Sequence, residues 1–172
     1  MRTYGNGKAV AIADDVMCVQ GIWRANTAFA LLQFDSEALA NRWRQSDPQF
    51  RHNDWLDDHD IWVLPLNQEL NDDVYFQLDL FGVCNKEKLE EDFIPKWLDG
   101  ISKNGGHPGV SCTGSVKVWR GVHDADYVVL SQWPSEENFK QWYESEEAKQ
   151  LREFQEHSSG CCTLLARMKM YT

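Results

Sequence analysis

An internal repeat constrains the fold of this chain more than any other feature of its sequence. The segment Phe29–Glu37 aligns with Val128–Glu136 at a shift of 99 residues, and the shift continues without a gap so that Trp43 falls on Trp142. Self-similarity of this kind marks a structural unit that occurs twice. The two copies are therefore predicted to share one architecture.

Each copy predicts a strand, a helix and a second strand. A run of branched and aromatic residues is followed by a serine and acidic residues, and then by an amphipathic stretch. Ser36 and Ser135 suit the N-cap position of the two helices. We expect residues 28–66 and 127–165 to superpose. The apolar stripe of the second helix consists of Phe139, Trp142, Tyr143, Leu151 and Phe154. We therefore expect Trp43 and Trp142 to be buried at equivalent sites.

The chain upstream of the second copy predicts one more strand and one more helix. The run 74–81 is typical of a strand, and apolar residues at helical spacing over 89–101 predict a helix. Pro95 lies inside that stretch, so we expect a kink or a helix in two pieces. With a further strand at 116–119, the order becomes β-α-β-β-α-β, which is the ferredoxin-like order.

The two halves of the chain are predicted to be unequal. Residues 1–66 have room only for a truncated ferredoxin-like repeat of order β-β-α-β, whereas residues 74–172 form the complete repeat. The polar segment 67–73 is predicted to link them. The expected fold class is α+β, with one truncated and one complete ferredoxin-like repeat.

Composition excludes several partner classes. The net charge is −10 and the pI is near 4.9, so no basic face is expected for nucleic acid or an anionic membrane surface. No apolar run approaches the roughly 20 residues of a membrane helix, and the start lacks the apolar core of a signal peptide.

Five cysteines show no metal-binding spacing, which indicates reduced thiols and a cytoplasmic location. Neighbouring Cys161 and Cys162 should point to opposite faces of a strand.

The second copy carries a recognisable set of segments, namely Trp119–Gly121, Asp126–Ser135 and Phe139–Ser145. Through them residues 74–168, and more weakly 22–66, resemble the dimeric α+β barrel superfamily and its DUF1330 group, near the antibiotic-biosynthesis monooxygenases. The resemblance implies two sheets that face each other and enclose a small, often aromatic, ligand. The barrel would form half against half within the chain as a pseudo-dimer, or through a homodimer of complete halves.

Alternation along strand 74–81 separates two faces. One face is apolar and suits a cover of helices; it consists of Val74, Phe76, Leu78 and Leu80. The other face is mixed and is expected to line the barrel; it consists of Tyr75, Gln77, Asp79 and Phe81. On the strand near 116–119, periodicity favours Ser115, Lys117 and Trp119 as the inward residues over their alternates Val116, Val118 and Arg120.

These faces supply the candidate site residues. Asp79 and His157 are the candidate catalytic groups, with His157 as a general base if it turns into the barrel. The candidate ligand-binding residues are Tyr75, Gln77, Lys117 and Trp119. Each has a structural alternative. Asp79 and Lys117 can pair with each other or meet water, and a histidine at a helix C-terminus is also an ordinary cap.

No metal and no cofactor are expected. Haem-degrading relatives carry a proximal histidine on the second helix, and the matching positions here are Arg152 and Asn53. The segment His52–Asp60, which includes His59, gathers imidazoles and carboxylates, but it suits a solvated edge better than a divalent ion site. Two function classes stay open. One is a cofactor-independent oxygenase or isomerase acting on a small hydrophobic molecule, and the other is a non-catalytic module that binds a ligand or a protein.

Overall fold

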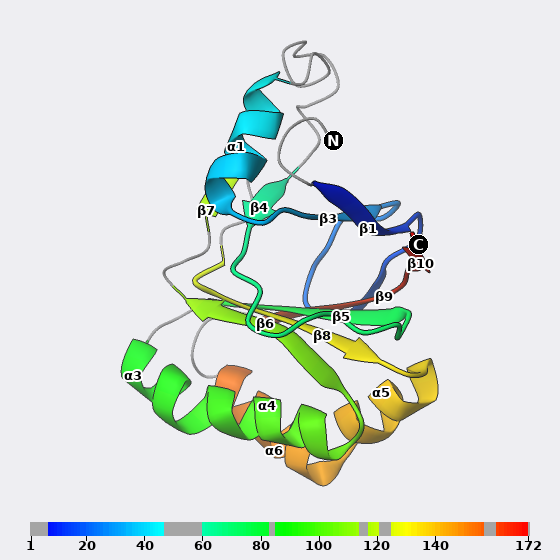
Figure 1. Ribbon diagram of the computed structural model, residues 1–172. Helices are drawn as coiled ribbons and strands as arrows, with labels where there is room; N and C mark the ends of the chain where they lie inside the picture. The colour runs from blue at the N-terminus through cyan, green and yellow to red at the C-terminus, as the bar shows by residue number, and fades with distance from the viewer. Residues whose placement is uncertain are drawn as a thin grey trace.

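The fold is α+β and its sheets are antiparallel (Figure 1). The computed structural model describes residues 7–46, 60–82, 85–113, 117–120, 125–156 and 161–171. Within these ranges the strands form one five-stranded, one three-stranded and one two-stranded sheet. None of the helices in the described ranges is long and apolar enough to cross a bilayer.

The five-stranded sheet is the centre of the molecule. Its strands, in spatial order, are β2 (Met17–Gln20), β9 (Cys161–Arg167), β5 (Tyr75–Phe81), β8 (Tyr127–Trp133) and β6 (His107–Thr113). Each neighbouring pair is antiparallel. The predicted strand at 74–81 is confirmed as β5, and every residue from Phe76 to Phe81 in it is buried.

Helices cover one face of this sheet (Figure 1). They are α3 (Lys86–Lys88), the π-helical turn η3 (Leu89–Phe93), α4 (Ile94–Lys103), α5 (Glu136–Tyr143) and α6 (Glu146–Glu156). The break predicted near Pro95 is confirmed, because α4 begins at Ile94 directly after η3 and has Pro95 in its first turn. The backbone stays helical across this change, because the Ile94 amide donates to the Leu89 carbonyl of η3. Ser135 caps α5 as predicted by accepting a hydrogen bond from the Asn138 amide at 3.1 Å.

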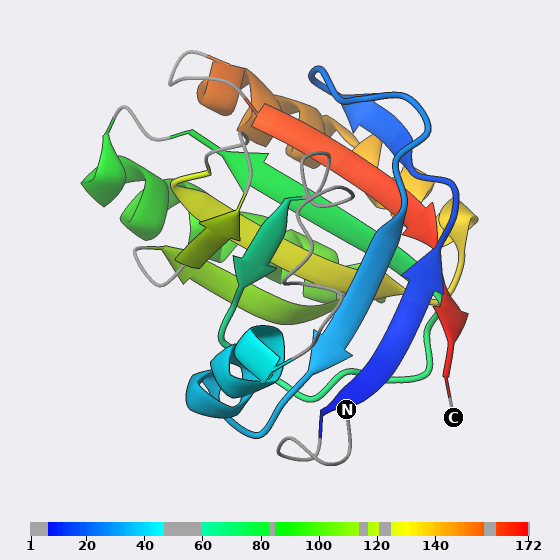
Figure 2. The same cartoon turned by 90° about the horizontal axis from the view of Figure 1, so that it is seen from above.

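A second layer of strands lies over the other face (Figure 2). It contains the sheet β10-β1-β3, formed by Lys169–Met170, Lys8–Ala13 and Phe29–Gln33, and the pair β4 (Ile61–Val63) and β7 (Lys117–Arg120). Helix α1 (Glu37–Ser46) connects β3 towards β4. Ser36 caps α1 as predicted, through a 3.3 Å hydrogen bond from the Leu39 amide.

The strand predicted near 116–119 is present, but its predicted place in the sheet is wrong. The strand near 116–119 is β7 and pairs with β4, whereas the second-half strand beside β8 is β6, which includes His107. Pro108 and Gly109 fit an edge strand because proline need not donate to a neighbour there, and the register shifts between Pro108 and Val110.

The two halves exchange strands. β2 of the first half adds to β9 of the second, and β10 at the end of the chain adds to β1. The segment 67–73 between them is docked on the second half. Gln132 Nε2 donates to the carbonyls of Asn71 and Asp73, and Gln132 Oε1 accepts from the Asn71 amide, each at 2.9 Å.

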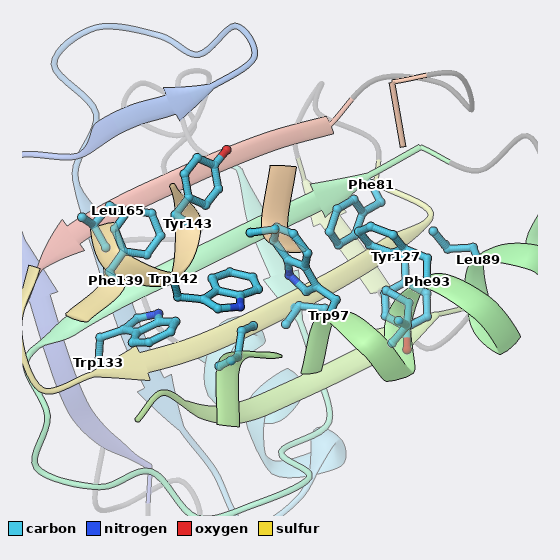
Figure 3. Close-up of a cluster of buried hydrophobic side chains, with 14 residues drawn as sticks. Phe81, Leu89, Phe93, Trp97, Tyr127, Trp133, Phe139, Trp142, Tyr143 and Leu165 are labelled. Atoms are coloured by element: carbon cyan, nitrogen blue, oxygen red, sulfur yellow. The ribbon is translucent and has the colours of Figure 1, made fainter. Parts of the chain in front are cut away.

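The faces of β5 are the reverse of the expectation. Phe76, Leu78 and Leu80 belong to the cluster between the two strand layers, which we call the inter-sheet cluster. Phe81 and Tyr75 instead contact the cluster beneath the helices, which we call the helix-side cluster (Figure 3). Gln77 and Asp79 alternate onto the same side as Phe81. The mixed face therefore lies beneath the helices. Its polar side chains can be buried there because they form hydrogen bonds with one another and with neighbouring side chains.

The two tryptophans of the repeat differ in burial. Trp142 is fully buried in the helix-side cluster, as predicted. Trp43 is only half-buried, and its ring lies 5.4 Å from that of Phe34. The prediction that both are largely buried is wrong for Trp43, because the first half has no counterpart of α4 among the described residues to cover α1.

Candidate functional site

A hydrogen-bond network around Asp79 is the most polar part of the interior. Asp79 Oδ2 accepts from Trp97 Nε1 at 2.9 Å and from Gln77 Nε2 at 2.8 Å, and Asp79 Oδ1 accepts from Thr163 Oγ1 at 2.8 Å. Gln77 Oε1 in turn accepts from Trp133 Nε1 at 2.8 Å. Asp79, Gln77 and Thr163 have no exposed surface. The network therefore joins three strands to α4 without contact with solvent.

The electrostatics of Asp79 reflect two opposed effects. Burial favours the neutral acid and raises the pKa of Asp79 from 3.8 to about 6. The hydrogen bonds from Trp97, Gln77 and Thr163 stabilise the carboxylate and act in the opposite direction, as does the positive charge of Arg152. Desolvation is the larger effect. Asp79 thus titrates in a range where few carboxyl groups do.

Aromatic rings from α4, α5 and β8 pack together on the helix side of the sheet, where the buried network lies (Figure 3). Trp97 meets Trp142 edge to face with ring centroids 4.4 Å apart, and Trp142 stacks on Trp133 at 5.8 Å. Gly100 permits the close approach of α4, since a Cβ there would come within 2.6 Å of Trp142 Nε1. A substrate cannot reach Asp79 without displacing these rings or the helices that carry them.

Tyr143 and Arg152 extend the polar region towards β2. The Tyr143 hydroxyl donates to Gln20 Oε1 at 2.7 Å, and the Arg152 guanidinium lies 3.9 Å above the Tyr143 ring. Burial raises the pKa of Tyr143 well above its usual value. Tyr143 therefore connects the edge strand β2 to α5, Arg152 of α6 packs on Tyr143, and the tyrosine stays neutral.

The inter-sheet side has a different chemistry. Its buried core is aliphatic apart from Phe76, and partly buried aromatic rings pack at its margin, among them Trp23, Phe29 and Trp62. Trp23 and Trp62 meet edge to face at 6.4 Å. The Nε1 atom of Trp62 is buried and has no hydrogen-bond acceptor among the described residues. An indole N–H of this kind is available to an acceptor atom brought by a ligand.

The predicted site residues do not come together. Gln77 and Asp79 share the buried network, and Tyr75 lies half-buried at the edge of the helix-side cluster. The backbones of Lys117 and Trp119 lie in β7, in the other strand layer, and their side chains are outside the described part. His157 and the segment from His52 to His59 also lie outside the described residues. Within the described ranges, no group of three or more His, Cys, Asp or Glu side chains is arranged to hold a metal ion.

Three residues that shape the helix side and the inter-sheet side of the five-stranded sheet were not predicted from the sequence. Trp97 and Thr163 hold Asp79, and Trp62 lies at the margin of the inter-sheet cluster. Trp97 belongs to the apolar residues at helical spacing over 89–101, and its ring was expected to be buried. A buried indole N–H needs an acceptor, so a tryptophan in such a stripe indicates that a buried polar group lies nearby. Nothing in the local sequence indicates Trp62, because its partners come from distant strands.

The sequence matches no protein-family model, and no curated protein is significantly similar to it. The resemblance to the DUF1330 group stays a prediction.

Proposed function

We propose that this chain is a non-catalytic binding protein for a small aromatic or otherwise apolar molecule, held between the two strand layers. The observation that carries the proposal is the buried Trp62 N–H, which has no acceptor among the described residues although it borders an apolar cluster. Leaving such a donor unsatisfied costs about 1–3 kcal/mol, and a ligand with a carbonyl or hydroxyl oxygen would remove that cost.

The distribution of buried polar groups supports binding over catalysis at this place. Five polar or charged residues are buried among those described. By strand alternation, four of them face the helix side: Gln77, Asp79, Ser131 and Thr163. Gln132 alternates onto the inter-sheet side, where its amide is engaged by Asn71 and Asp73. The described inter-sheet side therefore offers shape and apolar contact but no buried acid or base.

We also propose that the two strand layers are the halves of a barrel formed within one chain, built from a truncated and a complete ferredoxin-like repeat. Three observations support this assignment. First, the order β3, α1, β4 repeats as β8, α5, β9. Second, α1 and α5 begin at Glu37 and Glu136, which the sequence repeat aligns. Third, the helical connections from β5 to β6 and from β8 to β9 each skip one strand of the sheet. The free thiols of Cys18, Cys161 and Cys162 fit a reducing compartment such as the cytoplasm.

A second candidate function, a cofactor-independent oxygenase or isomerase, is favoured by one observation. Asp79 has a pKa raised to about 6, and perturbed carboxyl groups of this kind are common at active sites. This reading requires the substrate to enter beneath α4 and α5. It predicts that the unmodified chain turns a substrate over and that Asp79→Asn abolishes this turnover, whereas the binding proposal predicts turnover in neither chain.

The binding proposal predicts a specific response to Trp62→Phe, which keeps a ring and removes the N–H. Two probes of similar shape separate the effects: acetylnaphthalene carries a carbonyl oxygen and naphthalene does not. Calorimetry should show that Trp62→Phe weakens acetylnaphthalene binding about tenfold, as loss of one buried hydrogen bond implies, and changes naphthalene binding little.

Trp43→Phe is the matched control, because Trp43 packs on Phe34 away from the inter-sheet cluster. This variant should bind both probes as the unmodified chain does. Equal weakening of acetylnaphthalene by both variants, or binding that survives Trp62→Phe unchanged, would refute the assignment of the site.

A further inference from the structure

The edge strand β2 places Cys18 diagonally across from Cys162 of β9. Cys18 is paired with Leu164, and Gln20 is paired with Thr163, so β2 advances two residues while β9 advances one. This bulge carries the chain after Cys18 towards Cys162. Because β2 has only four residues and lies at the edge of the sheet, its backbone is held by hydrogen bonds on one side only.

Both cysteines face the same side of the sheet. Val19 contacts the helix-side cluster, so its neighbour Cys18 points the other way, as does its partner Leu164 in the inter-sheet cluster. Cys162 packs against the inter-sheet cluster, whereas Cys161 packs against the helix-side cluster. The prediction that Cys161 and Cys162 point to opposite faces is confirmed, and it leaves Cys18 as the thiol that shares a face with Cys162.

Gly21 lies between the two cysteines and contacts both. Gly21 has φ +88°, and a Cβ at this position would lie 2.6 Å from the Cys161 carbonyl oxygen and 3.0 Å from Cys162 Cα. The Cys18 Sγ donates to the Gly21 carbonyl at 3.5 Å, so the sulfur is turned towards this contact. Cys18 also contributes to the raised pKa of Cys162, which fits two thiols that lie near each other. Both are free.

We propose that Cys18 and Cys162 are a redox modification site, and that they form a disulfide with a small-molecule disulfide of the glutathione type as oxidant. The bond would fasten β2 to β9. A disulfide requires Cα atoms about 4.4–6.8 Å apart, and a bulged strand at the edge of the sheet can shift to meet this distance.

The reaction proceeds by two exchanges. The exposed Cys18 loses a proton, and its thiolate attacks one sulfur of the oxidant, forming a mixed disulfide and releasing one small thiol. The Cys162 thiolate, after loss of its own proton, then attacks Cys18 Sγ and expels the second small thiol. Two protein thiols are oxidised by two electrons, and one small-molecule disulfide is reduced to two thiols, which take up both protons.

The second exchange should be the slow one. Burial, with a smaller contribution from Cys18, raises the pKa of Cys162 to about 12, so little thiolate is present at neutral pH. We therefore expect the mixed disulfide at Cys18 to appear first and the internal disulfide to follow. A rise in pH should speed the second exchange.

The test treats the reduced full-length chain with oxidised glutathione, blocks remaining thiols by alkylation and maps cross-linked peptides by mass spectrometry. The expected product links the peptides containing Cys18 and Cys162. It should form roughly tenfold faster, or more, in the folded chain than in urea, because folding raises the effective concentration of the two thiols. Amide hydrogen exchange across Met17–Gln20 should slow once the bond forms.

Three variants assign the bond. Cys161→Ser should still form it, which separates the two adjacent cysteines, while Cys18→Ser and Cys162→Ser should not. Cys18 is exposed, so Cys18→Ser is expected to fold. If Cys162→Ser fails to fold, Cys18→Ser alone shows whether the bond requires Cys18. A mixed disulfide at Cys18 that never resolves, a bond to another cysteine, or equal rates in folded and unfolded chain would each overturn the proposal.

Discussion

Replacing Trp142 with alanine is expected to lower the free energy of unfolding by about 3–5 kcal/mol, as truncations of buried aromatic side chains do. Trp142 has no exposed surface and meets both Trp97 and Trp133. Its loss would leave a cavity between α4, α5 and the five-stranded sheet, beside the rings that donate hydrogen bonds to Asp79 and Gln77. Urea denaturation followed by far-ultraviolet circular dichroism measures the change.

Trp43→Ala is the natural control, because the repeat aligns Trp43 with Trp142 but the first is only half-buried. We expect it to cost less than half as much as Trp142→Ala, since less apolar area returns to water when alanine replaces it. Equal costs for the two variants would contradict the different packing of the two halves. Little change in the urea midpoint of Trp142→Ala would contradict the packing of the helix-side cluster.

The second large effect is a pH dependence that comes from Asp79. Its pKa is 3.8 in the unfolded chain and about 6 in the folded protein, so the native state binds this proton more tightly. Stability from Asp79 is therefore fully present below pH 3.8 and is lost as the pH rises through about 6. Above that range the buried carboxylate should cost about 3 kcal/mol relative to the protonated form.

The measurement must be a difference between two variants, so that every other pH-dependent contribution to stability cancels. The difference between the unfolding free energies of the unmodified chain and of Asp79→Asn should change by about 3 kcal/mol as the pH rises from 4 to about 6, and should then stay constant up to pH 8. The asparagine side chain of this variant keeps the shape of the aspartate and cannot ionise, although its amide opposes the donors Trp97 and Gln77. That conflict adds a constant offset. A constant difference over the whole range would show that Asp79 does not titrate as described.

Local patterns predicted much of the secondary structure. The strand at β5 and the caps Ser36 and Ser135 followed from short-range spacing, as did the break before Pro95. These features depend on residues within one or two turns of each other, and the sequence contains that information directly.

The orientation of β5 was not predictable in the same way. A face that carries Gln77 and Asp79 looks like one that lines a cavity, and it lies beneath helices only because Trp97, Trp133 and Thr163 satisfy it. Those partners are 18, 56 and 84 residues away from the groups they contact. The pairing of β2 with β9 and of β10 with β1 is equally non-local. Alternation along one strand fixes which residues share a face, but it does not say what covers each face.

The most direct test of the proposed function is a crystal structure of the full chain soaked with acetylnaphthalene. The binding proposal predicts electron density between the two strand layers, with the ring against the inter-sheet cluster and the carbonyl oxygen within hydrogen-bond distance of Trp62 Nε1. Density beneath α4 and α5 beside Asp79, with the inter-sheet side empty, would contradict it and favour the enzyme.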